Sequence, residues 1–260
     1  MPIMTSYDHG QFSWVDLSAY DMNEAKTFYG EVFGWSVEDQ DTGGGPPYAI
    51  FTNGGHQVAG LGQMSEEMKA QVPGSCWNSY VNVDDAEAVA KKAEGLGAKL
   101  LFPVMQVMDA GWMTFLVDPS GAPFAIWQKN KHIGAQQVND PGSLSWNELA
   151  SRDLEASKAF YGELFGWTFE ENTEGKSKYF VANNQGKMNG GLIEMTKEWG
   201  EVPPHWAVYF TVENADATVA TIERMGGKAV VEPFDISIGR IAVMADPHRG
   251  HFNIYQSKQK

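Results

Sequence analysis

The chain has 260 residues, of which 43% are hydrophobic and 12% aromatic, a composition typical of a folded globular protein. Its formal net charge of −14 argues against binding to nucleic acid or to an anionic membrane, because both need clustered Lys and Arg. There is no membrane-spanning apolar run and no secretory signal pattern, and the single cysteine, Cys76, cannot form an internal disulfide. We therefore expect a cytoplasmic protein, either a monomer or a homodimer.

The first segments of the chain alternate between strand and helix patterns. Alternating residues over 12–19 predict a strand, and Asp21 then offers a helix N-cap, with Glu24 three residues further on. Apolar residues at helical spacing continue to Gly34, where the helix is expected to end. Three short strands follow before residue 64, separated by glycine-rich turns. This order, βαβββ, predicts one compact module.

A second module of the same order follows at residues 80–128. Asp84 and Asp85 begin its helix, and a turn at Asp118-Pro119 joins its last two strands. The following polar stretch contains Gly and Pro and is predicted to be a linker, in which His132 is assigned no role.

The rest of the chain repeats this pattern. Trp14, Tyr29 and Trp35 recur at a constant offset of 132 (146 − 14, 161 − 29, 167 − 35), and Asn214 takes the place of the second helix cap. Solenoid repeats have periods of only about 20–50 residues, so the repeat indicates two domains, each long enough to bury its own core. The predicted boundaries are domain 1 at 8–129, a linker at 130–142 and domain 2 at 143–257.

These features resemble the vicinal oxygen chelate superfamily, which includes glyoxalase I, bleomycin-resistance proteins and extradiol dioxygenases. The resemblance rests on the paired βαβββ modules, the helix motif x-x-Phe-Tyr-x-x-x-x-Gly-Trp and the closing Asp-Pro turn, and it covers nearly the whole chain twice. It implies an α+β fold of two tandem glyoxalase-like domains, each made of two paired βαβββ modules. It also implies a concave cleft in each domain, which holds a divalent metal in the family's enzymes.

The residues at the family's metal-ligand positions are unsuited to a metal. The family takes its ligands from the first, fourth, fifth and last strands of a domain. In domain 1 these positions fall on Trp14, Gln63, Asn78 and Ala125. In domain 2 they fall on Trp146, Glu194, Ala207 and Asn253. Only Glu194 is a strong ligand type, so we expect no cofactor, with a divalent metal as the alternative.

Strand alternation predicts which side chains line the clefts. Val15 and Leu17 should face the helices, which leaves Trp14 and Asp16 facing the cleft. Asp16 and its counterpart Glu148 are the predicted catalytic residues, because a carboxylate among aromatic rings is rarely buried without a partner or a purpose. The predicted ligand-binding residues are mostly aromatic: Trp14, Asn78, Tyr80, Trp127, Trp146, Tyr209, Asn253 and Tyr255. The alternative is that the rings only fill the clefts and the carboxylates are structural acceptors.

The leading functional hypothesis is a protein that binds a small, planar organic molecule in an aromatic cleft and can transform it without the usual metal. The rival is a metal-dependent lyase or dioxygenase with a displaced metal site in domain 2. That site would use Glu148, Glu194, His205 and His251. A third possibility is that one domain only supports the other.

Overall fold

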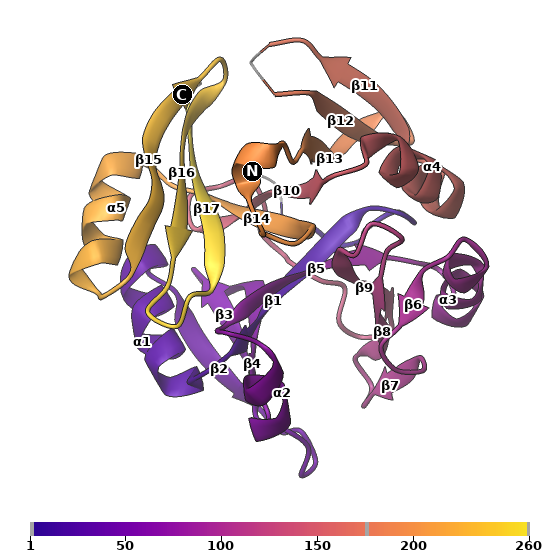
Figure 1. Ribbon diagram of the computed structural model, residues 1–260. Coiled ribbons are helices and arrows are strands. Elements are labelled where there is room, and N and C mark those ends of the chain that lie inside the picture. The colour runs from indigo at the N-terminus through magenta and orange to yellow at the C-terminus, as the bar shows by residue number, and fades with distance from the viewer. Residues whose placement is uncertain (1–2, 175–176, 259–260) are drawn as a thin grey trace.

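The computed structural model describes residues 3–174 and 177–258, which form two large β-sheets with helices packed against them (Figure 1). The first half contains β1 (Phe12–Ala19), α1 (Met22–Phe33), β2 (Ser36–Gln40), β3 (Tyr48–Asn53), β4 (His56–Gln63), α2 (Glu66–Gln71), β5 (Cys76–Asn82), α3 (Ala86–Gly95), β6 (Lys99–Leu100), β7 (Met105–Val107), β8 (Gly111–Val117) and β9 (Pro123–Lys129). The second half contains β10 (Ser143–Ser151), α4 (Leu154–Phe165), β11 (Thr168–Asn172), β12 (Tyr179–Asn184), β13 (Lys187–Glu194), the 3-10 turn η1 (Lys197–Trp199), β14 (His205–Thr211), α5 (Ala215–Arg224), β15 (Lys228–Ile236), β16 (Gly239–Ala245) and β17 (His251–Ser257).

Each half forms one continuous sheet from its two modules. The strand order is β2-β3-β4-β1-β5-β9-β8-β6 in the first sheet, with β7 paired to β8, and β11-β12-β13-β10-β14-β17-β16-β15 in the second. In both sheets the antiparallel pairing of the two central strands, β1 with β5 and β10 with β14, joins the modules. The two sheets have the same topology, so the predicted α+β fold of paired βαβββ modules is confirmed.

Local sequence signals explain where the helices begin. The Asp21 carboxylate accepts hydrogen bonds from the backbone N–H groups of Asn23 and Glu24, and Asn214 accepts one from Ala217. These side chains satisfy donors that the first turn of a helix leaves free. No helix in the described part of the chain is long and apolar enough to cross a membrane.

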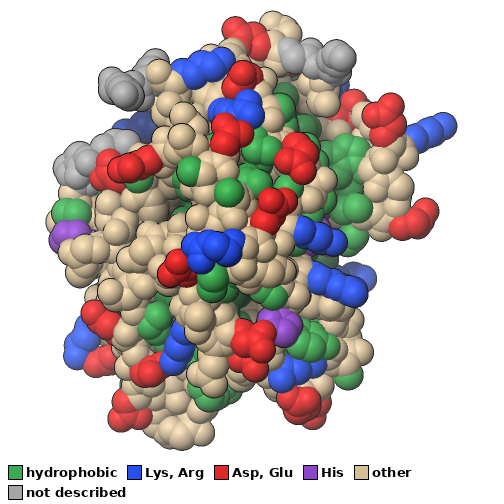
Figure 2. All heavy atoms as spheres, turned by 90° about the vertical axis from the view of Figure 1, so that its left-hand side faces the viewer, with side chains coloured by type: hydrophobic (Ala, Val, Ile, Leu, Met, Phe, Trp, Pro, Cys, Tyr) green, Lys and Arg blue, Asp and Glu red, His purple; other side chains and the backbone are tan. Residues whose placement is uncertain are grey.

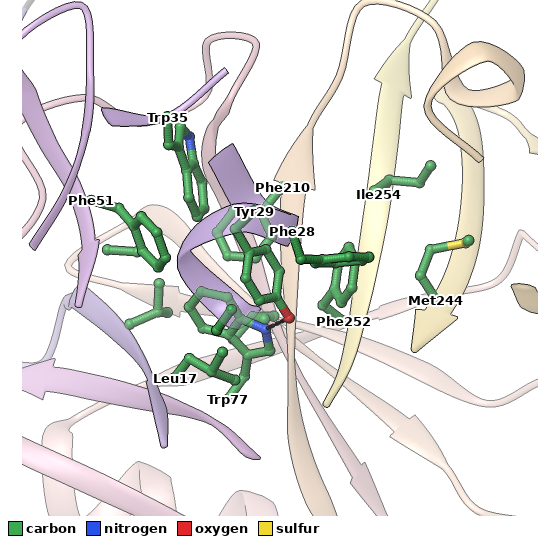
Figure 3. Packing of buried hydrophobic residues seen from close by; sticks show 14 of the residues in the cluster. Leu17, Phe28, Tyr29, Trp35, Phe51, Trp77, Phe210, Met244, Phe252 and Ile254 are labelled. Carbon is green, nitrogen blue, oxygen red and sulfur yellow. Dashed lines mark hydrogen bonds between the residues drawn. The ribbon is translucent and has the colours of Figure 1, made fainter. Parts of the chain in front are cut away.

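Helices α1, α3, α4 and α5 lie between the two sheets, and the two larger hydrophobic cores are each built from both halves. One core combines the first module with the last, so that Tyr29 and Trp35 of the first half pack against Phe210 and Phe252 of the second (Figure 3). The other core combines the two middle modules. The expectation that each half buries its own core is therefore wrong, because the apolar faces of the helices meet the opposite half.

A pair of crossed hydrogen bonds ties the halves together. The Tyr29 hydroxyl donates to Asp246 at 3.0 Å, and the equivalent Tyr161 hydroxyl donates to Asp118 at 2.9 Å. Each phenol oxygen also accepts from an indole N–H, from Trp77 and Trp206 respectively. The tyrosine of the helix motif and the aspartate of the Asp-Pro turn are thus partners across the two halves.

The face of each sheet turned away from these cores is called its outer face below. On the first sheet it carries Trp14, Asp16, Asn78, Tyr80, Ala125 and Trp127, which strand alternation and register place side by side. On the second sheet it carries Trp146, Glu148, Ala207, Tyr209, Asn253 and Tyr255. The predicted site residues therefore do gather on one face of each sheet.

Candidate functional site

Asp16 sits at the centre of the first outer face and is held by three side chains. The Tyr80 hydroxyl donates to Asp16 Oδ2 at 2.7 Å, and the Tyr48 hydroxyl reaches the same oxygen at 3.5 Å. Asn78 Nδ2 donates to Oδ1 at 2.8 Å and also to Ser18. Burial raises the pKa of the Asp16 carboxyl, while these hydrogen bonds act in the opposite direction. With an exposed fraction of 8%, Asp16 is a buried acceptor with its partners supplied by the protein.

The predicted linker covers this face. The His132 ring packs edge-on against Trp14, with 4.5 Å between ring centroids, and lies 5.6 Å from the ring centroid of Trp127. Trp127 Nε1 donates to the His132 carbonyl oxygen at 2.9 Å. Ala135 is completely buried, and its N–H donates to Ser13. The linker is therefore part of the interior of the first half, which the sequence did not indicate.

Glu148 takes the place of Asp16 on the second outer face but has a different set of partners. The Tyr209 hydroxyl donates to Glu148 Oε1 at 2.8 Å, and the nearby Tyr179 hydroxyl also acts to lower the pKa of the carboxyl. Ala207 stands where Asn78 stands in the first half, so the amide donor is absent. Burial among these groups raises the pKa of Glu148, and the two phenols partly oppose that shift.

The two faces differ most in exposure. Trp14, Tyr80 and Trp127 are 3%, 3% and 5% exposed. Their counterparts Trp146, Tyr209 and Tyr255 are all partly exposed, as is Glu148 itself. The aromatic groups and the carboxylate of the second face are therefore more exposed than their counterparts on the first face.

The second face continues into an apolar wall on its last strands. Val243 pairs with Asn253 and Ile241 with Tyr255, which places both side chains on the outer face. Beyond them Val231 and Phe234 pair with Val243 and Ile241 and are 44% and 40% exposed. Exposed apolar side chains in a continuous row favour contact with an organic molecule rather than with water.

Tyr48 and Tyr179 were missed in the sequence analysis. Each hydroxyl accepts from the indole of the first strand, Trp14 at 3.2 Å and Trp146 at 3.0 Å. The tyrosine lies over a glycine of the neighbouring strand, and a Cβ on Gly191 would come within 1.9 Å of the Tyr179 hydroxyl oxygen. The two tyrosines are 131 positions apart (179 − 48), within one residue of the repeat offset of 132, and this is the signal that could have found them.

Asn253 and Tyr255, the remaining predicted residues of the second half, also lie on its outer face. Asn253 is buried beside Tyr209 in the sheet register. The Tyr255 hydroxyl donates to the Ile238 carbonyl at 3.0 Å, which leaves its ring on the outer face. Two surface hollows lie beside α1, lined by residues such as Glu24, Phe28 and Pro247, and include none of the predicted site residues.

The residues at the family's metal positions do not fit a metal in the first half. Gln63 accepts from the Met22 N–H and donates to backbone carbonyls around the start of α1, so it holds the helix rather than facing the site. Asn78 donates to Asp16, and Trp14 and Ala125 offer no ligand atom.

The second half fits a metal no better. Of the four residues at the family's metal positions in this half, Glu194 is a strong ligand type. The other three are Trp146, Ala207 and Asn253. The displaced site expected as an alternative, with Glu148, Glu194, His205 and His251, is not formed. Within residues 3–174 and 177–258, no group of three or more His, Cys, Asp or Glu side chains could hold a metal ion.

Comparisons with known proteins agree with this architecture. The family model described as "Glyoxalase/Bleomycin resistance protein/Dioxygenase superfamily" matches residues 11–126 and again 143–254. The chain belongs to this superfamily. Both halves are therefore glyoxalase-like domains by sequence as well as by topology.

Two relatives resemble the chain over nearly its whole length. The Mycobacterium tuberculosis protein CFP32, which carries a glyoxylase name, is 38% identical over 257 residues, covering 98% of this chain and 97% of its own. The anthracycline biosynthesis protein DnrV of Streptomyces peucetius is 32% identical over 272 residues, covering 98% of this chain and 96% of its own.

Solved structures with the same fold include metal-dependent enzymes. The Mn(II)-bound glyoxalase from Novosphingobium aromaticivorans superposes with a TM-score of 0.65 at 15% identity, covering 95% of this chain and 82% of its own. The 2,3-dioxygenase LapB from Pseudomonas sp. KL28 also gives 0.65, at 13% identity, with 96% and 93% covered. At such low identity these matches show a shared fold only.

Proposed function

We propose that this glyoxalase-superfamily protein binds a small planar aromatic molecule on the outer face of its second sheet, with Glu148 as the polar anchor. The observation that carries the proposal is the contrast between Glu148 and Asp16. Asp16 is buried and has three side-chain partners, whereas Glu148 is partly exposed and has only two phenols. The second carboxylate is the one that a ligand can reach.

The surroundings of Glu148 suit a flat, mostly apolar ligand. Trp146, Tyr209 and Tyr255 present partly exposed rings on the same face, next to the apolar wall of Ile241 and Val243. Aromatic side chains bury large areas and pack well on flat rings, and a few polar groups then set the ligand's orientation. The name of the DnrV relative points to the same ligand class, because an anthracycline is a planar fused-ring molecule.

Glu148 can do two things for such a ligand. As a carboxylate it accepts a hydrogen bond from a ligand O–H or N–H, and a bond to a charged group is stronger than a neutral one. Its raised pKa brings proton removal from a phenol or an acidic C–H closer to neutral pH. Tyr209 and Tyr179 hold the carboxylate in place while it does so. No step of this chemistry needs a metal.

The first outer face is assigned a structural role in this proposal. Its aromatic residues form a small buried cluster with Ala135 of the linker. The charge of the molecule also fits a small organic ligand better than a nucleic acid. Figure 2 shows acidic side chains scattered over the face formed by α1 and α5, with Lys and Arg interspersed rather than gathered into a basic patch.

The test is a titration with hydroxylated planar compounds, using 1,4-dihydroxyanthraquinone and an anthracycline as probes and intrinsic fluorescence quenching as the readout. Glu148→Gln keeps the shape and removes the charge, so we expect the affinity to fall by about tenfold or more. Asp16→Asn in the first half is the matched control and should leave the affinity unchanged. Circular dichroism of each variant verifies that the fold is intact.

A second variant gives Glu148 the amide donor that Asp16 has in the first half. Ala207→Asn places an amide where Asn78 donates to Asp16, so that Glu148 gains a competing donor. We expect weaker probe binding in Ala207→Asn than in the wild type. Equal loss of affinity in Asp16→Asn and Glu148→Gln, or no binding of any probe by the wild type, would contradict the proposal.

A further inference from the structure

We infer that the second outer face contains a ring subsite formed by Trp146, Tyr255 and Met188, and that the first half fills the same subsite with its own His132. This inference rests on the proposed function, which it extends by giving the position and the chemical character of the ligand's ring.

The first half shows how a planar ring is held at this place. The imidazole of His132 meets Trp14 and Trp127 edge-on, at interplanar angles of 83° and 74°. Gln57 Oε1 lies 3.1 Å from His132 Nδ1 and gives the ring its polar partner. Desolvation lowers the pKa of His132 to about 4, so the ring held there at neutral pH is uncharged. The linker thus behaves as a built-in ligand of the first face.

The strand pairing identifies the residues of the second half that are equivalent to Trp14, Trp127 and Gln57. Trp14 pairs with Tyr80 as Trp146 pairs with Tyr209. Trp127 pairs with Asn82 as Tyr255 pairs with Thr211. The third position follows the same rule, since Gln57 pairs with Thr52 and Met188 pairs with Asn183. The three side chains of the second half therefore surround an equivalent place.

Exposure shows that the described part of the chain leaves this place more open than the equivalent place in the first half. Met188 is 74% exposed, and the rings of Trp146 and Tyr255 are partly exposed. An exposed methionine next to two partly exposed aromatic rings is an unfavourable arrangement in water, and binding a flat apolar group would cover all three.

The exchange of Gln57 for Met188 predicts the chemistry of the ring. Glutamine supplies a hydrogen-bond partner to the imidazole nitrogen, whereas a thioether is a weak acceptor that makes favourable apolar contacts with an aromatic ring. We therefore expect a benzene-type ring rather than a nitrogen heterocycle at this end of the ligand. The hydroxyl of Thr211, which is buried and has no hydrogen-bond partner among the described residues, offers one polar contact at the register position of Tyr255.

The experiment follows the methionine methyl group by NMR in protein labelled with ¹³C-methyl methionine. Addition of 1,4-dihydroxyanthraquinone should shift the Met188 methyl resonance upfield through the ring current. The exposed Met105 and Met108 of the first half serve as internal controls and should not move. Met188→Ala assigns the resonance and should weaken binding by about two- to tenfold, whereas Gln57→Met should leave the affinity unchanged.

The possible outcomes separate this inference from the proposed function. If Glu148→Gln weakens binding but the Met188 methyl resonance and the Met188→Ala affinity do not change, the ring lies elsewhere and the inference is wrong while the proposed function stands. If the Met188 methyl shifts and Glu148→Gln has no effect, the subsite is supported and the role of Glu148 is wrong. Absence of any binding overturns both.

Discussion

The outer faces of the two sheets have the same strand register and aromatic residues at the same positions, but they differ in what covers them. On the first face the His132 ring and Ala135 of the linker lie over Trp14 and Trp127. On the second face the equivalent rings of Trp146 and Tyr255 are partly exposed. The same scaffold therefore provides a closed interior in one half and an accessible surface in the other.

This difference shows how a duplicated domain can divide its tasks. The interactions that build the fold are kept in both halves, as with the crossed bonds Tyr29 to Asp246 and Tyr161 to Asp118. The residues that decide access and polarity are the ones that differ, such as Asn78 against Ala207 and Gln57 against Met188. The comparison can be tested by making equivalent changes in the two halves.

The largest difference is expected for the two tryptophans of the central strands. Trp14→Ala removes a buried side chain and should lower the free energy of unfolding by about 3–5 kcal/mol. Trp146→Ala removes a partly exposed one and should cost less than half as much. Urea denaturation followed by circular dichroism measures both. Equal losses would mean that the second face is as closed as the first.

Removing the carboxylate should also lower the free energy of unfolding more in the first half than in the second. Asp16→Ala leaves the buried Tyr80 hydroxyl and an Asn78 amide hydrogen without their acceptor, which should cost about 2–4 kcal/mol of unfolding free energy. Glu148→Ala should cost about 1 kcal/mol or less, because the partly exposed Tyr209 can turn to water. The same denaturation experiment applies, and a larger loss in Glu148→Ala would reverse the assignment of the structural carboxylate.

The crossed bonds provide a pair for which we expect no difference. Tyr29→Phe and Tyr161→Phe each remove the acceptor of an indole N–H and a donor to a buried carboxylate. Each should lower the free energy of unfolding by about 2 kcal/mol. The two losses should agree within about 0.5 kcal/mol. A clear inequality would show that the halves are not held together symmetrically.

The smallest effect concerns the pH dependence of binding. The raised pKa of Glu148 means that its carboxylate forms above the usual value of 4.5, so probe affinity should rise as pH increases through that raised pKa. The rise should reach about tenfold, equivalent to about 1.4 kcal/mol. Glu148→Gln should abolish it.

The raised pKa of Glu148 should make stability fall over the pH range in which probe affinity rises. A carboxyl whose pKa is higher in the folded protein binds more protons there than in the unfolded chain, so it lowers stability as pH rises from 4.5 through the raised value. The wild type should therefore lose stability relative to Glu148→Gln over this window. Parallel denaturation curves at several pH values measure the difference, and a constant difference would mean that the pKa of Glu148 is not raised.

Much of the fold could be predicted because its signals are local. Asp21 and Asn214 begin helices through hydrogen bonds to residues two or three positions away. Alternation along single strands predicted that Trp14 and Asp16, or Trp146 and Glu148, share a face. The repeat indicated two equivalent domains, and the paired βαβββ order, the helix motif and the Asp-Pro turn indicated the family.

Contacts between distant residues could not be predicted in this way. Tyr29 and Asp246 are separated by 217 positions, and neither shows in its local sequence that the other will receive its hydrogen bond. The shared cores follow from the same long-range packing, since an apolar helix face does not specify which sheet will cover it.

What the sequence by itself determined was the set of side chains on each outer face, because side-chain direction follows from strand periodicity. What only the tertiary structure decided was which of these faces is open. The linker is polar and has no periodicity, so nothing in it indicated that His132 would pack on Trp14 while the equivalent Trp146 stays partly exposed. Exposure depends on the path of the chain in space, and it is exposure that distinguishes Asp16, to which the proposed function assigns a structural role, from Glu148, the proposed ligand anchor.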